Sequence, residues 1–328
     1  MKFVMFLLRF FPPEVSHFFA LNALNILFKI KLLKLFFPAP KVSDTFKYKG
    51  LVFKNKLGIA AGLDKNGDFI DSLGALGFGF IEIGTITPLP QPGNLKPRIF
   101  RFADQGAIVN RLGFNNKGVD YLVEQVKASN FSGILGINIG ANKESTGQKR
   151  IDDYVECFKK VSSYADYIAI NISSPNTPNL RSLHSEKNFL PLFEAISSMR
   201  HEQSYMNPIF VKLSPDEDDK TISVIISAIR KYNFDGVITS NTTIEKENLI
   251  NSSNYDLTGG LSGKPLFKKS NNLLHSVHAH DPELLKIGVG GVFCSENMHT
   301  KLELGASLVQ IYTSFIFQGP KIVQKLLK

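Results

Sequence analysis

The sequence contains only two cysteines, Cys157 and Cys294, among its 328 residues. Two thiols are too few for a cysteine-rich zinc or iron–sulfur site, and they indicate no disulfide framework. The chain also lacks a run of 18 apolar residues, because charged side chains interrupt every candidate, so a membrane-spanning helix is not expected. No internal repeat or low-complexity tract is visible. With 43% hydrophobic residues, the chain is predicted to be globular and to belong to a reducing compartment.

Basic residues are concentrated at the N-terminus. The chain holds 38 Lys and Arg against 29 Asp and Glu, a formal net charge of +9. Residues 1–49 carry a net charge of +6, whereas the other 279 residues carry only +3. The same 49 residues hold ten of the 27 phenylalanines. A segment that is both basic and strongly apolar favours a membrane surface over nucleic acid as its partner.

Residues 1–37 are predicted to form two short helical stretches. The first, 2–11, ends at two prolines, and the second, from about 14 to 37, ends at Pro38. We interpret the pair as amphipathic helices that dip into the headgroup region of a membrane, with lysines around a Phe/Leu face. A helical pair that only caps the main domain is the alternative. A signal peptide is disfavoured, because Arg9 and the prolines interrupt the region that should be apolar.

Eight short apolar segments recur from residue 57 onward, each followed by small or polar residues. Continuous apolar runs of this length are typical of parallel strands buried on both faces. Helix-like stretches, such as 154–164, 189–200 and 220–231, lie between most of them. The pattern predicts an α/β fold, a (β/α)8 TIM barrel with an N-terminal helical extension, and a doubly wound sheet is the rival. The segments are 57–60, 80–84, 134–139, 167–172, 209–213, 236–239, 286–289 and 308–311.

Two connections between these segments are long, 85–134 and 241–286. Long connections in a compact domain are usually lids or binding loops. We regard residues 85–134, or the loop after Ser174, as candidates for a lid. Residues 46–55 are expected to form a small hairpin before the barrel.

Polar residues follow the predicted strands at their carboxyl ends, where (β/α)8 barrels carry their chemistry. The set contains no carboxylate pair and no histidine cluster, so two-carboxylate or zinc-dependent hydrolysis fits poorly and no metal site is expected. Asn side chains offer paired donors and acceptors and Lys adds positive charge, which suits a planar anionic ligand with amide groups. The residues are Lys65, Thr85, Asn138, Asn171, Ser174, Asn176, Lys212, Ser240, Asn241 and Thr242.

Gly290-Gly291 and Tyr312-Thr313 follow the seventh and eighth segments. Barrels commonly bind a phosphate there on bare backbone N–H groups. A phosphate together with a planar, polar-edged ring suggests flavin mononucleotide (FMN). A Gly-Gly pair is by itself more often a plain turn, and one barrel lysine is as often a salt-bridge partner, so the interpretation depends on the joint placement of all eight strand ends.

Five long and specific motifs carry a resemblance that covers essentially the whole chain. The sequence resembles the class 2 dihydroorotate dehydrogenases, which are quinone-dependent and membrane-associated. That family has an FMN-binding barrel and oxidises dihydroorotate to orotate in pyrimidine biosynthesis. The resemblance implies a membrane and quinone-access segment at 1–37 and a flavin-binding barrel at 38–328. The motifs are 60–66 (AAGLDKN), 83–93 (IGTITPLPQPG), 110–116 (NRLGFNN), 171–178 (NISSPNTP) and 259–265 (GGLSGKP).

The loop after the fourth strand indicates the class. Class 1 enzymes resemble this chain but carry a cysteine as the base, whereas residues 171–176 read NISSPN here. The resemblance therefore implies that Ser174 removes the C5 proton of dihydroorotate while the C6 hydride goes to flavin N5. Thr177 is a candidate proton relay, with a turn or capping role as the alternative. Cys157 and Cys294 are expected to be structural.

The resemblance assigns further residues to substrate, flavin and quinone. Lys212 is expected near the N1–O2 side of the flavin, where a positive charge stabilises the reduced, anionic ring. His17 and Arg101 are candidates for the quinone site, although a lone histidine on a Phe-rich face is more often structural. The implied substrate residues are Lys65, Asn110, Arg111, Leu112, Gly113, Phe114, Asn171, Asn176, Asn241 and Thr242. The implied flavin residues are Ala61, Gly62, Leu63, Asp64, Lys65, Thr85, Asn138, Asn171, Lys212, Ser240, Gly263, Gly290, Gly291, Tyr312 and Thr313.

The expected partners are dihydroorotate and orotate, a membrane quinone, and anionic lipid at the cytoplasmic face of the inner membrane, with no nucleic acid. A class 1 enzyme using fumarate or NAD is opposed by Ser174 and by the N-terminal helices. A tRNA-dihydrouridine synthase is opposed by the low charge of the barrel. A non-catalytic basic protein that binds membranes or nucleic acid would not need the Asn/Ser/Lys set.

Overall fold

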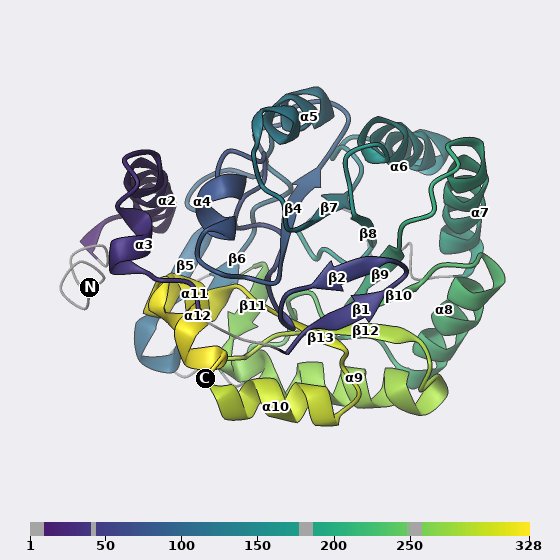
Figure 1. Ribbon diagram of the computed structural model, residues 1–328. Coiled ribbons are helices and arrows are strands. Elements are labelled where there is room, and N and C mark those ends of the chain that lie inside the picture. The colour runs from purple at the N-terminus through teal and green to yellow at the C-terminus, as the bar shows by residue number, and fades with distance from the viewer. Residues whose placement is uncertain (1–9, 41–43, 177–185, 248, 250–257) are drawn as a thin grey trace.

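Eight parallel strands close into a barrel surrounded by helices in the computed structural model, which describes residues 10–40, 44–176, 186–247, 249 and 258–328 (Figure 1). This is the predicted (β/α)8 barrel, and each strand begins and ends within two residues of the expected position. In order around the barrel the strands are β3 (Leu57–Ile59), β4 (Phe80–Ile86), β7 (Ile134–Ile139), β8 (Tyr167–Asn171), β9 (Ile209–Leu213), β10 (Gly236–Thr239), β12 (Leu285–Val289) and β13 (Leu308–Ile311).

The surrounding helices are amphipathic, and α8 (Asp219–Lys231) illustrates why they form. Its isoleucines at 222, 225, 226 and 229 are buried and share one face of a 3.6-residue period. Asp218 caps the helix by accepting a hydrogen bond from the Thr221 backbone N–H over 2.7 Å. The other helices of the barrel are α4 (Ile70–Gly74), α5 (Val119–Ala128), α6 (Gly147–Val161), α7 (Glu186–Glu202), α9 (Phe267–His280), α10 (Ser295–Glu303), α11 (Thr313–Gln318) and α12 (Lys321–Leu326).

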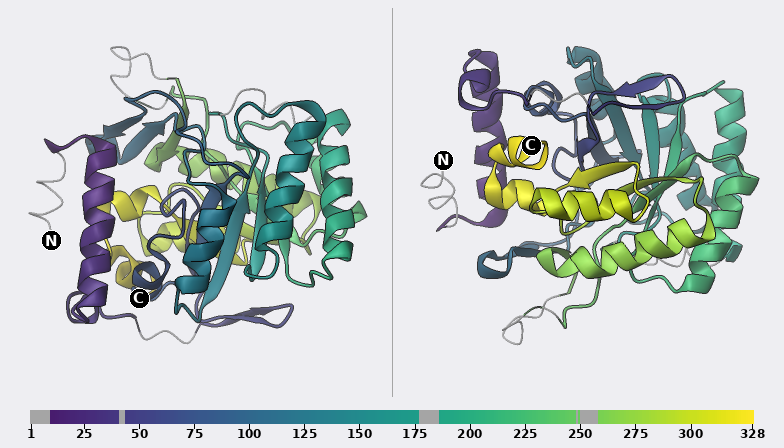
Figure 2. Two further views of the ribbon diagram at one scale, coloured as in Figure 1. Left: turned by 90° about the horizontal axis from the view of Figure 1, so that it is seen from above. Right: turned by 60° about the horizontal axis from the view of Figure 1, so that its bottom comes forward.

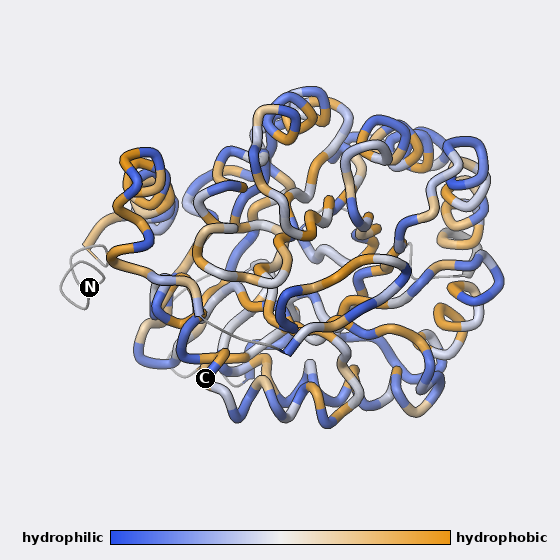
Figure 3. The backbone as a smooth tube through the Cα atoms, in the orientation of Figure 1, coloured by the Kyte–Doolittle hydropathy of each residue, from blue (hydrophilic) through white to orange (hydrophobic). Residues whose placement is uncertain are grey.

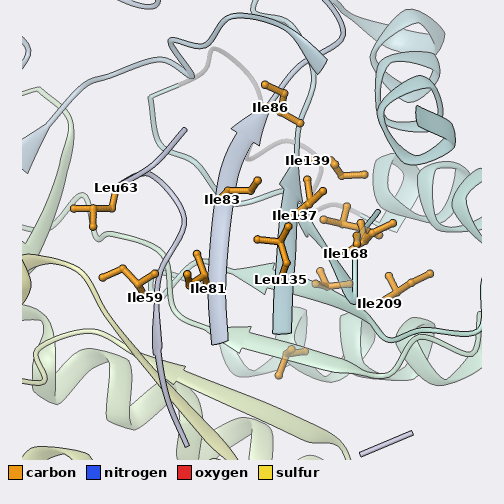
Figure 4. Packing of buried hydrophobic residues seen from close by; sticks show 14 of the residues in the cluster. Ile59, Leu63, Ile81, Ile83, Ile86, Leu135, Ile137, Ile139, Ile168 and Ile209 are labelled. Carbon is orange, nitrogen blue, oxygen red and sulfur yellow. The ribbon is translucent and has the colours of Figure 1, made fainter. Parts of the chain in front are cut away.

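Each barrel strand contributes to two cores, because successive side chains of a strand point to opposite faces. Ile81 and Ile83 of β4, with Ile137 of β7 and Ile168 of β8, belong to the cluster between the strands and the helices (Figure 4). The residues that alternate with these isoleucines along each strand point into the barrel. Those positions therefore determine what the interior of the barrel contains.

Aromatic rings fill the amino end of the barrel interior. Tyr167 stacks edge to face on Phe210 with ring centroids 5.3 Å apart, and Phe53 does the same on Phe80 at 5.5 Å. A Cβ at Gly136 would lie 2.0 Å from the Tyr167 ring, so the ring requires glycine there. This aromatic layer confines any ligand to the carboxyl end.

The expected hairpin before the barrel is formed by β1 (Phe46–Tyr48) and β2 (Leu51–Phe53), and it crosses one end of the barrel (Figure 1). Asp235, just before β10, anchors it: the carboxylate accepts a hydrogen bond from the Tyr48 hydroxyl and pairs with Lys49. The hairpin thus covers the amino end.

The two long connections pair with each other in a three-stranded antiparallel sheet of β5 (Ile99–Phe102), β6 (Ala107–Asn110) and β11 (Gly260–Gly263). Strands β5 and β6 come from the first connection and β11 from the second. The sequence predicted these residues only as lid or binding loops. Short 3₁₀ turns, η2 (Ala103–Gln105) and η5 (Lys264–Leu266), follow β5 and β11.

The N-terminal segment lies along one side of the barrel as α2 (Pro13–Lys29) and α3 (Leu33–Phe36) (Figure 2). The prediction of one helix over about 14–37 is wrong: α2 ends before Lys31, whose φ of +62° no α-helix accommodates. Most of the predicted first stretch, 2–11, lies outside the described residues. Hydrophobic residues dominate both helices (Figure 3).

Some apolar residues of α2 face the barrel and others face solvent. Leu21 and Leu24 are buried against the barrel, whereas Phe18 and Phe19 are 61% and 56% exposed. In the part of the chain that the structure describes, no helix has the length and hydrophobicity needed to span a bilayer.

Candidate active site

A cavity opens at the carboxyl end of the barrel, and we call it the inner cavity. Its empty space, with the open mouth included, is about 980 Å³. Most of the residues predicted from the sequence meet here, because they follow the strand ends. The predicted residues in its lining are Ala61, Gly62, Lys65, Thr85, Asn110, Leu112, Gly113, Phe114, Asn171, Ser174, Asn176, Lys212, Ser240, Asn241, Thr242, Gly263, Gly290, Gly291, Tyr312 and Thr313.

Two predicted flavin residues stand behind the lining rather than in it. Asn138 is fully buried, and its side-chain oxygen accepts a 2.6 Å hydrogen bond from the Thr85 hydroxyl. Asp64 turns away from the inner cavity, and its carboxylate accepts hydrogen bonds from the backbone N–H groups of Gly67 and Phe69 over 2.9 and 2.7 Å. Asp64 therefore fixes the loop that carries Lys65.

Two further predicted residues do not reach the inner cavity. The Leu63 side chain is buried in the outer core, and only its backbone turns toward the N-terminal helix. Arg111 donates a hydrogen bond to the Thr258 hydroxyl over 2.8 Å, and its guanidinium lies over the Phe100 ring. The candidate relay Thr177 lies outside the described residues.

Asparagine side chains in the wall orient one another. Asn171 donates a 3.0 Å hydrogen bond to the Thr85 hydroxyl, and Asn241 donates one of 3.3 Å to the side-chain oxygen of Asn171. Across the mouth, Asn176 donates to the side-chain oxygen of Asn110 over 3.0 Å. Because these bonds fix which side of each amide donates and which accepts, the wall presents a set pattern of polar groups to a ligand.

Ser174 lies in this wall with a nearly buried side chain. Its Oγ accepts a 3.3 Å hydrogen bond from the backbone N–H of Asn176. Over the residues that the structure describes, no histidine or carboxylate is hydrogen-bonded to it. The hydroxyl therefore keeps its own proton available toward the cavity.

A carboxylate that the sequence reasoning missed stands beneath the cavity. Glu82 accepts hydrogen bonds from Asn138 over 2.8 Å, from the Tyr167 hydroxyl over 2.9 Å and from Gln310 over 2.7 Å. The Lys212 ammonium lies 3.9 Å from the same carboxylate. Burial lowers the pKa of Lys212, and the charge of Glu82 opposes that shift. Glu82 thus helps to keep a positive charge at the cavity floor.

Lys65 brings a second amine to the cavity. Burial lowers its pKa to about 8, the charge of Arg98 adds to the effect, and Glu14 and Asp64 oppose it. Throughout the described ranges, no acidic side chain forms a salt bridge with Lys65. An anionic ligand at this position would therefore meet an uncompensated cation.

Three buried polar atoms in the lining have no hydrogen-bond partner within the described part of the chain: Asn176 Oδ1, Gln310 Oε1 and Ser314 Oγ. Buried groups of this kind normally satisfy a ligand or a water molecule. At Gly291, with φ +75°, a Cβ would lie 2.4 Å from the side chain of Phe267. Glycine leaves the backbone bare at that position, as a phosphate cradle requires. The lining therefore fits a flavin with a phosphate tail.

Several lining residues were not predicted. Gln310 and Ser262 had detectable signals: a polar residue at an inward position of an apolar strand, and a motif residue beside Gly263. Ala60 begins the 60–66 motif, but the other apolar residues carried no signal, since nothing in the sequence separates them from core residues. The unpredicted lining residues are Ala60, Ser262, Leu266, Val289, Val292, Phe293, Gln310, Ile311 and Ser314.

A second, larger cavity lies between α2 and the barrel, and we call it the outer cavity. It shares Lys65, Asn110, Leu112 and Tyr312 with the inner cavity. These four residues form a common wall, so the two cavities lie side by side.

The two predicted quinone residues line the outer cavity and also fasten α2. His17 donates from Nε2 to the Leu63 carbonyl over 2.9 Å. Burial and the Lys65 charge lower the pKa of His17 to about 4, so the ring is neutral at physiological pH. Arg101 donates to the carbonyl of Phe11 and to the hydroxyl of Ser16.

An ion pair completes the attachment of α2. Arg98, almost fully buried, donates from Nε to Glu14 over 2.5 Å, and Lys96 pairs with the same carboxylate at 2.9 Å. Burial alone would raise the pKa of Glu14, but the two cations hold it below its ordinary value. The helix is thus tied by charge to the loop before β5.

Comparison with known proteins gives the family. The family model described as dihydroorotate dehydrogenase matches residues 44–328. The chain belongs to the dihydroorotate dehydrogenase family. The match includes the whole barrel and every residue that lines the inner cavity.

Individual relatives agree over nearly the full length. A Cellvibrio japonicus protein named dihydroorotate dehydrogenase (quinone) is 47% identical over 95% of this chain and 92% of its own. A protein of the same name from Buchnera aphidicola is 45% identical over 98% and 97%. Among solved structures, the Eimeria tenella DHODH in complex with ferulenol superposes with a TM-score of 0.86 at 32% identity, over 96% of this chain and 89% of that one. The likeness therefore extends through α2 and α3.

Proposed function

We propose that this protein oxidises dihydroorotate to orotate in pyrimidine biosynthesis, holds FMN as its flavin, and passes the electrons to a membrane quinone. One observation carries the proposal: an inner cavity built from the family motifs shares a wall with an outer cavity lined by an apolar helix. A soluble electron acceptor would not need the outer cavity.

The substrate binds between Lys65 and the asparagine wall. Its carboxylate pairs with the Lys65 ammonium, which forms no salt bridge with any of the described acidic residues. Asn110 and Asn176 at the mouth, with Asn171 and Asn241 deeper, offer donors and acceptors to the ring amides. Thr242 and the backbone of residues 112–114 complete this side of the cavity.

FMN, when bound, supplies the acceptor for the hydride that leaves C6 of dihydroorotate. Ser174 takes the C5 proton, and its own proton must leave at the same time, because a serine hydroxyl is a weak base. Thr177 remains the proposed relay for that proton. The near-complete burial of Ser174 supports this role, since it keeps bulk water from the reacting atoms.

With FMN bound, the residues at the strand ends would hold the flavin ring, and the glycine pair would hold the phosphate. Lys212 stabilises negative charge on the ring, with Glu82 beneath it. Leu63, Asp64, Asn138 and Arg111 act from behind the lining by fixing the residues that touch ligands. The ring is held by Ala61, Gly62, Thr85, Asn171, Lys212 and Ser240, and the phosphate end by Gly263, Gly290, Gly291, Tyr312 and Thr313.

Quinone enters through the outer cavity, with His17 and Arg101 along its path. Residues 1–37 form the access segment and residues 38–328 the flavin-binding barrel. The exposed rings on α2 and the basic residues around them support peripheral contact with anionic lipid. We place the protein at the cytoplasmic face of the inner membrane.

Replacement of the proposed base tests the reaction. In Ser174→Ala we expect FMN to stay bound and to bleach normally with a chemical reductant, while reduction by dihydroorotate slows by about 10²–10⁴-fold, the usual contribution of a general base. Stopped-flow absorbance of the flavin measures both rates. Ser162→Ala, which removes a part-buried hydroxyl far from the cavity, is the control. A near-wild-type reduction rate in Ser174→Ala would remove Ser174 from the mechanism.

A further inference from the structure

Lys301 on α10 is a buried amine that the proposed reaction does not use. Its side chain has no exposed surface. The ammonium donates to the Ser270 hydroxyl over 3.0 Å and to the side-chain oxygen of Asn271 over 2.9 Å, and it lies 5.5 Å from the centre of the Phe267 ring. All of these partners are neutral.

Burying a cation without a paired acid makes folding less favourable, because the charge loses its hydration. In the part of the chain that the structure describes, no carboxylate forms a salt bridge with Lys301, and burial lowers its pKa to about 7. Lys212 differs, because Glu82 lies beside it. Lys286 differs too, because it donates to backbone carbonyls at the amino end of β12. Lys301 also stands beside the first turn of α9, where the helix dipole disfavours a cation.

The neighbours of Lys301 lead to the glycine pair at the phosphate end of the inner cavity. The Ser270 hydroxyl that accepts from Lys301 lies 3.2 Å from the Gly290 carbonyl. Gly291 packs directly on the backbone of Phe267. One serine therefore separates the ammonium from the segment that would cradle the phosphate.

We infer that Lys301 is the counter-charge of the flavin phosphate, a positioning residue that acts through Ser270 and the Gly290–Gly291 backbone. This inference rests on the proposed function, in which the ligand is FMN. The phosphate dianion supplies the negative charge that the fold does not provide. Binding of the phosphate end and protonation of Lys301 then favour each other.

The phosphate can be removed from the ligand without changing the ring, since riboflavin is FMN without it. In full-length Lys301→Met, which replaces the amine by an uncharged chain of similar length, we expect the dissociation constant of FMN to rise on the order of tenfold to a hundredfold, as for loss of one Coulombic interaction that acts across a serine and a backbone segment in a buried site. The constant for riboflavin should change less than about twofold. Flavin fluorescence on dilution of the loaded protein measures both. Lys286→Met is the matched control and should show no such difference.

A second variant keeps the inference testable if Lys301→Met fails to fold. Asn271→Asp places a carboxylate where the Asn271 oxygen now lies, 2.9 Å from the ammonium. Because it provides the missing acid, we expect it to raise the melting temperature of the flavin-free protein and still to weaken FMN more than riboflavin. A purely structural lysine would give the first effect without the second.

The outcomes separate the two proposals. Equal weakening of FMN and riboflavin in Lys301→Met, or no weakening of either, overturns the role of Lys301 and leaves the proposed function intact. A wild-type protein that binds no FMN overturns the proposed function and, with it, the inference.

Discussion

Three lysines near the inner cavity differ in the charges that surround them. Lys212 has a carboxylate 3.9 Å away. Among the described residues, the partners of Lys301 are neutral. The charges of Arg98 and Glu14 act on Lys65 in opposite directions. Burial lowers the pKa of all three. We therefore expect the anionic substrate to bind Lys65, which lines the inner cavity and forms no salt bridge with any described acidic residue.

Orotate binding should depend on pH through Lys65. The protonated amine binds the carboxylate, and its pKa in the free site is about 8. Below that pH the affinity should be level. Above it the free amine loses its proton, so the dissociation constant should rise toward about tenfold per pH unit. Titration of the flavin absorbance with orotate between pH 6 and 9.5 measures this, and a pH-independent, weak Lys65→Met variant is the control. A level profile in the wild type would contradict the assignment.

Glu82 is not among the residues proposed to contact substrate or flavin, but we expect it to contribute strongly to the stability of the protein. Glu82→Gln leaves Lys212 as a buried, unpaired cation and places an amide donor opposite Asn138. Breaking a buried pair typically costs about 3–5 kcal/mol. Urea unfolding should show a loss of this order, whereas Glu303→Gln at an exposed site should show almost none. A Glu82→Gln protein as stable as the wild type would mean that the pair carries no net stabilisation.

At the scale of elements, the eight barrel strands were predictable because each is a short apolar run with polar residues at its end. The sheet of β5, β6 and β11 was not, because its pairing joins segments about 150 residues apart and β11 reads Gly-Leu-Ser-Gly, a poor strand sequence. The site shows the same division. Ser174, in a motif, and Asn241, at a strand end, were predicted. Glu82 was missed because it lies inside an apolar run, where only the alternation of side chains along the strand would have shown that it points into the barrel.

The exposed rings of α2 should determine membrane binding. Phe18→Ser with Phe19→Ser removes two half-exposed rings without touching the buried face at Leu21 and Leu24. We expect several-fold weaker sedimentation with anionic phospholipid vesicles and unchanged flavin reduction by dihydroorotate. Met206→Ser, at another exposed apolar site, is the control. Unaltered vesicle binding in the double variant would contradict a membrane role for this face.

At the scale of the molecule, the excess positive charge and the residues that line the inner cavity lie in different parts of the chain. The first 49 residues carry +6 of the net charge, and the lining of the inner cavity begins only at Ala60. Attachment to a surface and reaction with substrate are therefore assigned to different stretches of sequence. The two cavities are adjacent at Lys65, Asn110, Leu112 and Tyr312, which line both.

Removal of residues 1–37 should separate the two half-reactions. The truncated protein should no longer reduce quinone or bind vesicles, because α2 and its charges are gone. Reduction of its flavin by dihydroorotate should continue, since every lining residue of the inner cavity remains. Assays with quinone and, separately, anaerobic stopped flow with dihydroorotate measure the two halves. Full quinone reduction by the truncated protein, or a yellow protein that dihydroorotate cannot reduce, would contradict this division.

The wall that α2 gives to the outer cavity has a consequence for inhibitors. The family model begins at residue 44, so it includes the inner cavity but not this helix. A compound shaped to the inner cavity meets groups that the shared chemistry demands, and it should act on family members broadly. A compound that fills the outer cavity rests against Phe18, Leu21 and their neighbours, on a helix that lies outside the residues matched by the family model. Selective inhibition should therefore be sought against the helix rather than against the reaction centre.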